Sequence, residues 1–435
     1  MFIGDVRRVQ WRVRSTRTGV TSAAASVVLL LVALEITAGI AGFQGPLHSL
    51  FSDYVATPKS ATVSWVALGV AIVGLTNRWR VLAVSVAAAL DVGFAAERVL
   101  RGGVLTVGNG PMIVLTGLAV VAWRLWAGAE RATALRTIAF GFLLIIATKV
   151  GDTWLHITPA VRPTVLDEYA LLADHALAQA SWVMGRLVEA GGPVLSALLH
   201  WVYIELPVAA MVVAIYQLRN VRTGIWPRHF LIRTFLVLGV IGPAIYVLFP
   251  VVGPVYAFGD YWPHALPPVD LTPAAVAFDD STPRNCMPSM HTAWALAVFI
   301  HSRGGPFWLR WAGTFWLVGT IAATLGFGYH YGVDLVAGAV LCLTVESALR
   351  EPVPGRVRSP LALVAFGSVF LVVLLLCYRY LAEAMAHHPL FFGSLIVAAM
   401  VVFSTAFYAT FFGRTGERGR FVATGGGSDP LASTT

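Results

Sequence analysis

The sequence predicts an all-α polytopic membrane protein, a helical bundle with about twelve transmembrane helices. Of its 435 residues, 57% are hydrophobic and only 12% are charged, and the mean hydropathy is +0.76. A soluble domain carries roughly 25% charged residues, so this composition excludes an ordinary cytosolic enzyme and a disordered chain. The net charge of +8 is not gathered in patches, which excludes nucleic-acid binding and makes the basic excess a signal of topology.

Twelve apolar segments approach the ~20 residues that a bilayer requires. The first follows five arginines and has no small-residue cleavage site, so we expect a membrane span there and not a cleaved signal. Two segments, 61–76 and 290–302, are short, and we expect one of them to be re-entrant or partly extended. The segments run roughly 22–43, 61–76, 80–96, 104–126, 133–153, 194–217, 230–250, 290–302, 307–327, 330–349, 360–382 and 390–412.

The basic residues predict the orientation of these spans. With the N-terminus inside, 22 of the 30 lysines and arginines fall on the cytosolic side and eight on the outer side, as the positive-inside rule requires. The sequence therefore predicts a multi-pass protein of the cell inner (plasma) membrane with both termini in the cytosol.

Five regions follow from this reading. They are a basic cytosolic N-terminus (1–21), accessory transmembrane helices (22–130), a core (131–350) with outer loops 151–192 and 251–288, two further transmembrane helices (351–413) and a disordered cytosolic tail (414–435). In the first loop, apolar residues from Leu172 to Leu187 recur at helical spacing, which predicts an interfacial or a solvated connecting helix. The second loop is rich in proline, aspartate and aromatic residues, and is predicted to be irregular.

Two helix starts on the predicted outer side carry the residues capable of chemistry. Residues 283–293 read Pro-Arg-Asn-Cys-Met-Pro-Ser-Met-His-Thr-Ala, and residues 328–334 read Gly-Tyr-His-Tyr-Gly-Val-Asp. His330 and Asp334 are four residues apart and share a helix face. The carboxylate can therefore fix the imidazole tautomer and leave the other ring nitrogen free to attack phosphorus. His291 can protonate the leaving oxygen as a general acid.

Neighbouring residues complete a predicted phosphate site. Ser289 lies at a helix N-terminus, where free N–H groups favour a phosphate, and Arg284 adds positive charge. Asn285 and Tyr329 are further candidates for substrate binding, as is Lys149 near the outer end of its helix, with Asp152 as its expected ion-pair partner. Ser289 could instead be a plain helix cap, and a lone His-x-x-x-Asp is usually a surface pair. The joint occurrence at two helix starts favours the catalytic reading.

The order Pro-Ser-x-His and then His-x-x-x-Asp resembles the second and third motifs of the type-2 phosphatidic acid phosphatase superfamily. The stretch 246–254 is also similar to the branch that contains inositol phosphorylceramide synthase and sphingomyelin synthase, and the resemblance covers roughly residues 133–350. It implies a six-helix core in which His330 forms a phosphohistidine, Asp334 orients it, His291 acts as acid and then base, and Ser289 touches the phosphate. It also implies catalysis without a metal or a cofactor.

The sequence departs from the family pattern in ways that bear on the reaction. Met290 replaces the usual glycine of the second motif, and Ala323 and Thr324 stand where phosphatases carry Ser-Arg. A Lys-x6-Arg-Pro first motif is missing as well. The transferase branch similarly lacks this arginine, which favours transfer to a second alcohol, with Arg284 as the best substitute and Lys149 as a weaker one.

The sequence thus favours a phosphotransferase that moves a phosphoryl-linked headgroup from a phospholipid to a lipid or glycan hydroxyl at the extracytoplasmic face. Its expected partners are a phospholipid or polyprenyl-phosphate substrate and the bilayer; the sequence indicates no particular protein partner. The first alternative is a lipid phosphatase that acts on phosphatidic acid, phosphatidylglycerol phosphate or a polyprenyl diphosphate. The second is a secondary transporter, which would show half-to-half symmetry and polar sites at the midplane. No such symmetry is visible in the sequence.

Overall fold

The computed structural model describes residues 25–56, 61–267, 272–353 and 359–412. The predicted basic N-terminus (1–21) and cytosolic tail (414–435) lie outside these ranges. The described residues are almost entirely helical, which confirms an all-α fold of membrane type. A single two-stranded sheet is present among them, with Thr164 of β1 opposite Ala277 of β2 in an antiparallel pair.

The long helices lie where the apolar segments predict them, and most boundaries shift by a few residues. Helix α6 (Gly128–Val161) is an exception, because it continues past the predicted end at 153 and into the predicted outer loop. The first helix is Ala25–Ile40. The other helices and strands are α2 (Pro46–Ser52), α3 (Ala61–Ala71), α4 (Asn77–Leu100), α5 (Asn109–Leu125), α6 (Gly128–Val161), β1 (Thr164–Val165), α7 (Asp167–Asp174), α8 (Ala180–Ala190), α9 (Gly192–Ile204), α10 (Leu206–Leu218), α11 (Leu231–Ile245), α12 (Pro254–Ala257), β2 (Val276–Ala277), α13 (Met290–Ser302), α14 (Phe307–Gly326), α15 (Gly332–Leu349), α16 (Pro360–Tyr380), α17 (Ala382–His387) and α18 (Pro389–Phe411).

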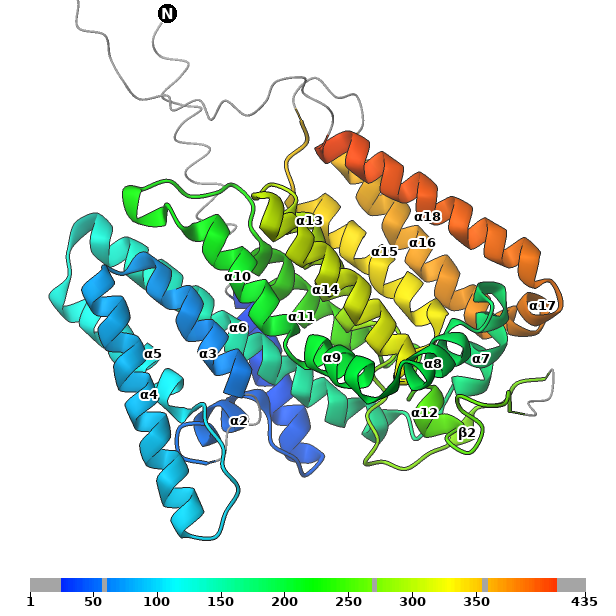
Figure 1. Cartoon of the computed structure of the whole chain (residues 1–435), viewed down its shortest axis with the longest axis horizontal. Helices are drawn as coiled ribbons and strands as arrows, with labels where there is room; N and C mark the ends of the chain where they lie inside the picture. The colour runs from blue at the N-terminus through cyan, green and yellow to red at the C-terminus, as the bar shows by residue number, and fades with distance from the viewer. Residues whose placement is uncertain (1–24, 57–60, 268–271, 354–358, 413–435) are drawn as a thin grey trace, which may run out of the picture.

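The long helices form three neighbouring groups (Figure 1). Helices α3, α4 and α5 lie at one side of the bundle, α16 and α18 lie at the other, and α9–α15 lie between them. Helix α6 joins the first group to the middle one because it packs against α3 and α5 as well as α11. The short elements α7, α8, α12 and β2 gather at one end of the bundle.

Within the described ranges, five helices are long and apolar enough to cross a bilayer, namely α4, α6, α15, α16 and α18. A sixth span results if α9 and the helical segment from Leu206, which are bent by 53°, are counted together. The sequence predicted one unbroken span at 194–217. Pro207 explains the break, because proline fits the first turn of a new helix but cannot continue a previous one. Multiple spans are supported, while the predicted number of twelve is not confirmed.

The sequence predicted the structure of the second outer loop (251–288) better than that of the first (151–192). The single helix expected over residues 172–187 is wrong, because α7 and α8 are separate helices. Ala178 and Gln179 between them adopt left-handed conformations with φ of 56° and 50°, which end α-helical geometry. The second loop is irregular, as predicted, over its described residues, apart from the short elements α12 and β2.

Buried charges in the accessory helices have structural partners. Lys149 Nζ lies 2.5 Å from Asp53 Oδ2, and both side chains are 5% exposed. Lys149 thus has an ion-pair partner that the sequence did not suggest, Asp53, which directly follows α2. Asp91 accepts hydrogen bonds from Trp65 Nε1 and from the backbone N–H groups of Gly108 and Gly110. These contacts satisfy charges that would be costly if unpaired at this depth.

Candidate active site

The starts of α13 and α15 are held directly against each other. The backbone N–H of Ser289, which precedes α13, donates to the backbone carbonyl of Asp334 in the first turn of α15 at 3.0 Å. Gly338, one turn further along α15, makes the approach possible, because a Cβ atom there would lie 2.2 Å from the Ser289 carbonyl oxygen. The two motifs that the sequence singled out are thus brought together by backbone contacts.

His330 lies in the short link between α14 and α15 and presents its two ring nitrogens to different partners. Nδ1 is 3.4 Å from Asp334 Oδ2, and Nε2 is 3.4 Å from Ser289 Oγ. Asp334 Oδ2 also accepts the backbone N–H of Tyr331 at 2.9 Å, which fixes the carboxylate. His330 is 4% exposed, and burial lowers the pKa of its imidazole to about 4, against an opposing hydrogen bond with the Cys286 backbone. The ring is therefore neutral at physiological pH, as a nucleophile must be.

Ser289 combines the two roles that the sequence left open. As the N-cap of α13, its Oγ accepts from the backbone N–H of Thr292 at 3.3 Å and from the Thr292 hydroxyl at 3.0 Å. The same oxygen faces His330 Nε2. A helix cap and a contact to the candidate nucleophile are thus made by one buried hydroxyl, at a helix N-terminus that suits a phosphate.

Two aspartates that sequence reasoning missed brace this site from α7. Asp167 accepts hydrogen bonds from the backbone N–H groups of Val252 and Gly253 and from the Tyr331 hydroxyl. Burial raises its pKa to about 7, although these hydrogen bonds oppose the rise. Asp174 Oδ1 accepts the backbone N–H of Val333 at 3.0 Å. The available signal was acidic residues in an otherwise apolar helical segment.

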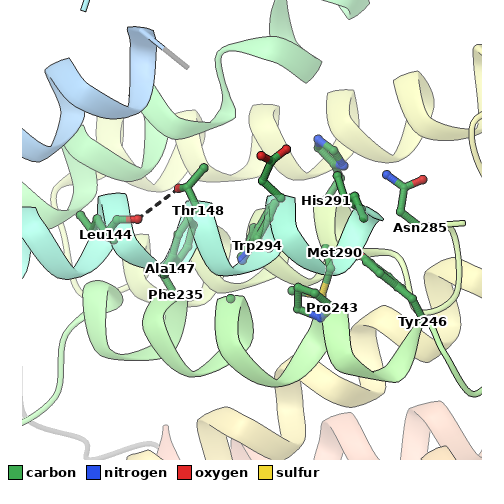
Figure 2. Close-up of a pocket in the computed structure, with 14 residues that line it drawn as sticks. Leu144, Ala147, Thr148, Phe235, Pro243, Tyr246, Asn285, Met290, His291 and Trp294 are labelled. Atoms are coloured by element: carbon green, nitrogen blue, oxygen red, sulfur yellow. Dashed lines mark hydrogen bonds between the residues drawn. The ribbon is translucent and has the colours of Figure 1, made fainter. Parts of the chain in front are cut away.

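His291 lies one position into α13 and borders a cavity. Its ring stacks on Tyr203 with centroids 4.0 Å apart and planes inclined by 19°. Tyr203 also contacts Tyr329, and their ring centroids are 5.3 Å apart. Tyr329 directly precedes His330 in the chain. The cavity has a volume of about 290 Å³ and lies between α6, α11 and the start of α13. Figure 2 shows His291 and Asn285 at one end of it, and Leu144, Ala147 and Phe235 at the other.

The remaining predicted residues are not all brought to this site. Asn285 lines the cavity with His291, and the carbonyl of Tyr329 accepts the thiol of Cys286 at 3.0 Å. Arg284 is fully buried, and its guanidinium donates to the loop carbonyls of Asp279, Thr282, Pro163 and Phe278. Four hydrogen bonds from its two terminal nitrogens thus hold the loop, while its Nε is buried and has no hydrogen-bond partner among the described residues. Lys149 is held by Asp53 and does not line the cavity.

Two groups of side chains among the described residues are close enough to hold a metal ion. In the site itself, Cys286, His330 and Asp334 present ligand atoms within 4.8 Å of one another. The second group, His229, His301 and Glu346, lies in a buried polar network away from these motifs. There Glu346 accepts from Arg350 at 2.8 Å and is 2.7 Å from His301 Nε2. Sequence reasoning did not single out His229, whose partners are distant in the chain.

Comparisons with known proteins divide the chain in two. Residues 19–157 match a domain of unknown function (DUF5933), and residues 170–348 match the PAP2 superfamily. Neither a curated protein nor a solved structure matches the chain. The second match includes Ser289, His291, His330 and Asp334, while the branch that contains inositol phosphorylceramide synthase is not confirmed. Residues 170–348, called the PAP2 domain below, are therefore similar to the PAP2 superfamily, and this similarity supports an activity of the lipid phosphatase or phosphotransferase type.

Proposed function

We propose that the protein is a phospholipid headgroup phosphotransferase, with His330 as its nucleophile. The observation that carries this proposal is the placement of His330 between Asp334 and Ser289, with Nδ1 and Nε2 each 3.4 Å from one of them. Asp334 can accept a hydrogen bond from a protonated Nδ1. The lone pair then lies on Nε2, next to the N-terminal end of α13, where a phosphate would bind. This division of roles is the one that nucleophilic attack by an imidazole requires.

In the first half-reaction, His330 Nε2 attacks the phosphorus of a phospholipid. A nitrogen–phosphorus bond forms, and the bond from phosphorus to the glycerol oxygen breaks. His291 donates a proton to that oxygen, so a neutral diacylglycerol leaves and the phosphoryl-linked headgroup stays on His330. The proton balance leaves His291 neutral and ready to act as a base.

In the second half-reaction, an acceptor alcohol takes the place of the diacylglycerol. His291 removes the hydroxyl proton, the alkoxide oxygen bonds to phosphorus, and the bond to His330 breaks. Both histidines return to their starting protonation states, with the headgroup now on the acceptor. This sequence needs no metal or cofactor.

The buried, apolar surroundings of His330 and His291 favour transfer to an alcohol over hydrolysis by water. His330 and Asp334 are 4% and 0% exposed, and the cavity beside His291 has a largely apolar lining. A dry, apolar approach favours an alcohol over water as the second nucleophile. The terminal nitrogens of Arg284 donate to loop carbonyls, and Ala323 and Thr324 stand where phosphatases carry Ser-Arg, so the site carries less positive charge than a phosphatase site.

The proposal extends to orientation. The site would face the extracytoplasmic side of the plasma membrane, because the basic residues of the sequence favour cytosolic termini. The phospholipid would then enter from the outer leaflet. Helices of residues 22–130 and 351–413 would flank the catalytic core.

The test is release of the headgroup from purified full-length protein in EDTA. Labelled phosphatidylinositol, phosphatidylglycerol, phosphatidic acid and undecaprenyl diphosphate are each supplied with and without alcohol acceptors, beside His330→Ala. We expect diacylglycerol to appear only with an acceptor, together with a new phosphodiester, and to be absent with His330→Ala. Free phosphate from a monoester or diphosphate without an acceptor would establish a phosphatase instead. Activity that EDTA abolishes and Zn²⁺ restores would contradict the metal-free mechanism.

A further inference from the structure

The cavity beside His291 adjoins a second cavity of about 190 Å³. The two share four lining residues, Leu144 and Thr148 on α6, Phe235 on α11 and Trp294 on α13. One wall of the combined cavity therefore comes from the region 19–157 and the facing wall from the PAP2 domain. The site has an extension that the PAP2 domain does not enclose alone.

The combined cavity is amphipathic along its length. His291 and Asn285 lie at one end and Leu144 and Phe235 at the other (Figure 2). Beyond them, the second cavity is lined almost entirely by apolar side chains from α3, α10 and α11. A ligand that fits such a space has one polar end and a long apolar chain.

The length of the combined cavity follows from α11 and the residue after it, which contribute lining residues from Leu231 to Tyr246. At 1.5 Å per residue, these positions span about 22 Å along the helix. This length suits a long aliphatic chain and exceeds what a short soluble alcohol would fill.

Resting on the function proposed above, we infer that this cavity binds the aliphatic chain of the lipid alcohol whose oxygen exchanges a proton with His291. The leaving alcohol and the accepting alcohol both bond to phosphorus on the side opposite His330, because the displacement is in line. Both must therefore place their oxygen near His291, and this cavity is a lipid-sized space that borders His291. The accessory helices α3 and α6 thereby take part in selecting the acceptor.

Trp294 supplies an independent observation. Its indole Nε1 is buried and has no hydrogen-bond partner among the described residues, and the side chain lines both cavities. Buried indole N–H groups are normally paired. An ester carbonyl or hydroxyl oxygen of a lipid in the cavity would satisfy it.

The test is photolabelling of the full chain with hexadecanol that carries a terminal diazirine, followed by peptide mapping. Because the hydroxyl end lies at His291 and the diazirine at the far end of the chain, we expect label within residues 63–70 on α3, 207–214 on α10 and 231–235 on α11. Unlabelled hexadecanol should compete and hexanol should compete little. Gly239→Leu should reduce this labelling at least tenfold, because a Cβ at Gly239 already lies 3.4 Å from the Cβ of Ala147 across the cavity.

Gly93→Leu on α4 is the matched control, because a Cβ there meets nothing within 4 Å. Gly151→Val fills the cavity from the opposite wall, where a Cβ would lie 3.8 Å from Pro243, and covers the case in which Gly239→Leu does not fold. Label that survives both cavity variants in the three segments that line the second cavity, or label found only on outer faces of the bundle, would overturn the inference. Site-specific labelling by a protein that shows no transfer would uphold the cavity and count against the proposed function alone.

Discussion

The Nε2 atom of His330 lies 3.4 Å from the Oγ atom of Ser289, across the junction between the starts of α15 and α13. The hydroxyl that caps one helix therefore faces the imidazole that precedes the other. Fold and chemistry are coupled at this contact, and substitutions here should affect both.

Ser289→Ala should lower stability and turnover together. Loss of the N-cap costs about 1 kcal/mol of unfolding free energy, and loss of a phosphate contact should reduce kcat by about 100-fold. Ser359→Ala is the control, because Ser359 is the exposed N-cap of α16 without a side-chain capping bond. Thermal unfolding in detergent and steady-state turnover check both effects. An unchanged kcat would reduce Ser289 to a plain cap.

Asp334→Asn should lower kcat by about 100-fold or more while the protein stays folded. The amide keeps the carboxylate's shape but favours the wrong tautomer of His330, whose Nδ1 lies 3.4 Å from Oδ2. Asp260→Asn, at an exposed loop position, is the matched control. Turnover of the Asp334 variant close to wild type would refute an orienting role.

The acid limb of the pH profile of kcat/KM should lie at an unusually low pH. Because burial lowers the pKa of His330 to about 4, the neutral nucleophile predominates above that pH and is lost only as the pH falls through it. We expect kcat/KM for a phosphodiester donor, whose phosphate does not titrate here, to fall on the acid side only below about pH 5. A fall toward higher pH would report loss of the His291 proton that the first half-reaction uses. Circular dichroism at each pH separates titration from unfolding. An acid limb centred near 6.5, the ordinary histidine value, would contradict this account.

The ion pair between Asp53 and Lys149 should matter for stability and not for chemistry. Both side chains are 5% exposed, so Asp53→Ala leaves a buried ammonium unpaired and should cost about 3–5 kcal/mol. The double variant Asp53→Leu with Lys149→Met removes both charges and should recover much of that loss. Its activity per folded molecule measures any role of Lys149 in phosphate binding, which the pairing argues against. A folded double variant without turnover would restore that role.

The helices were predictable from the sequence because their signals are local. The predicted span 290–302 coincides with α13, since an apolar run there follows directly on the cap Ser289. The proximity of His330 to Asp334 was predicted from a shared helix face, but His330 precedes α15. Asp334 instead reaches back over the helix start, where its Oδ2 accepts the backbone N–H of Tyr331 and lies 3.4 Å from His330 Nδ1. The break after Glu205 was missed because the apolar run continues through it, although Pro207 marked the place.

Long-range contacts were not predictable in the same way. Lys149 forms an ion pair with Asp53, which is distant in the sequence. The terminal nitrogens of Arg284 donate hydrogen bonds to backbone carbonyls of a folded loop. The bracing by Asp167 requires that α7 pack against the start of α15. Periodicity and spacing carry no information about which distant segments meet, so these partners emerge only from the three-dimensional structure.

The account rests on a covalent bond to His330, and rapid acid-free quenching with a donor labelled at phosphorus tests it directly. The full-length protein is mixed with labelled phosphatidylinositol without an acceptor, denatured at alkaline pH and mapped by peptide. We predict label on the peptide that contains His330, its loss on addition of the acceptor, and its absence in His330→Ala. Turnover that proceeds with no label on that peptide, or that survives His330→Ala, would contradict the account.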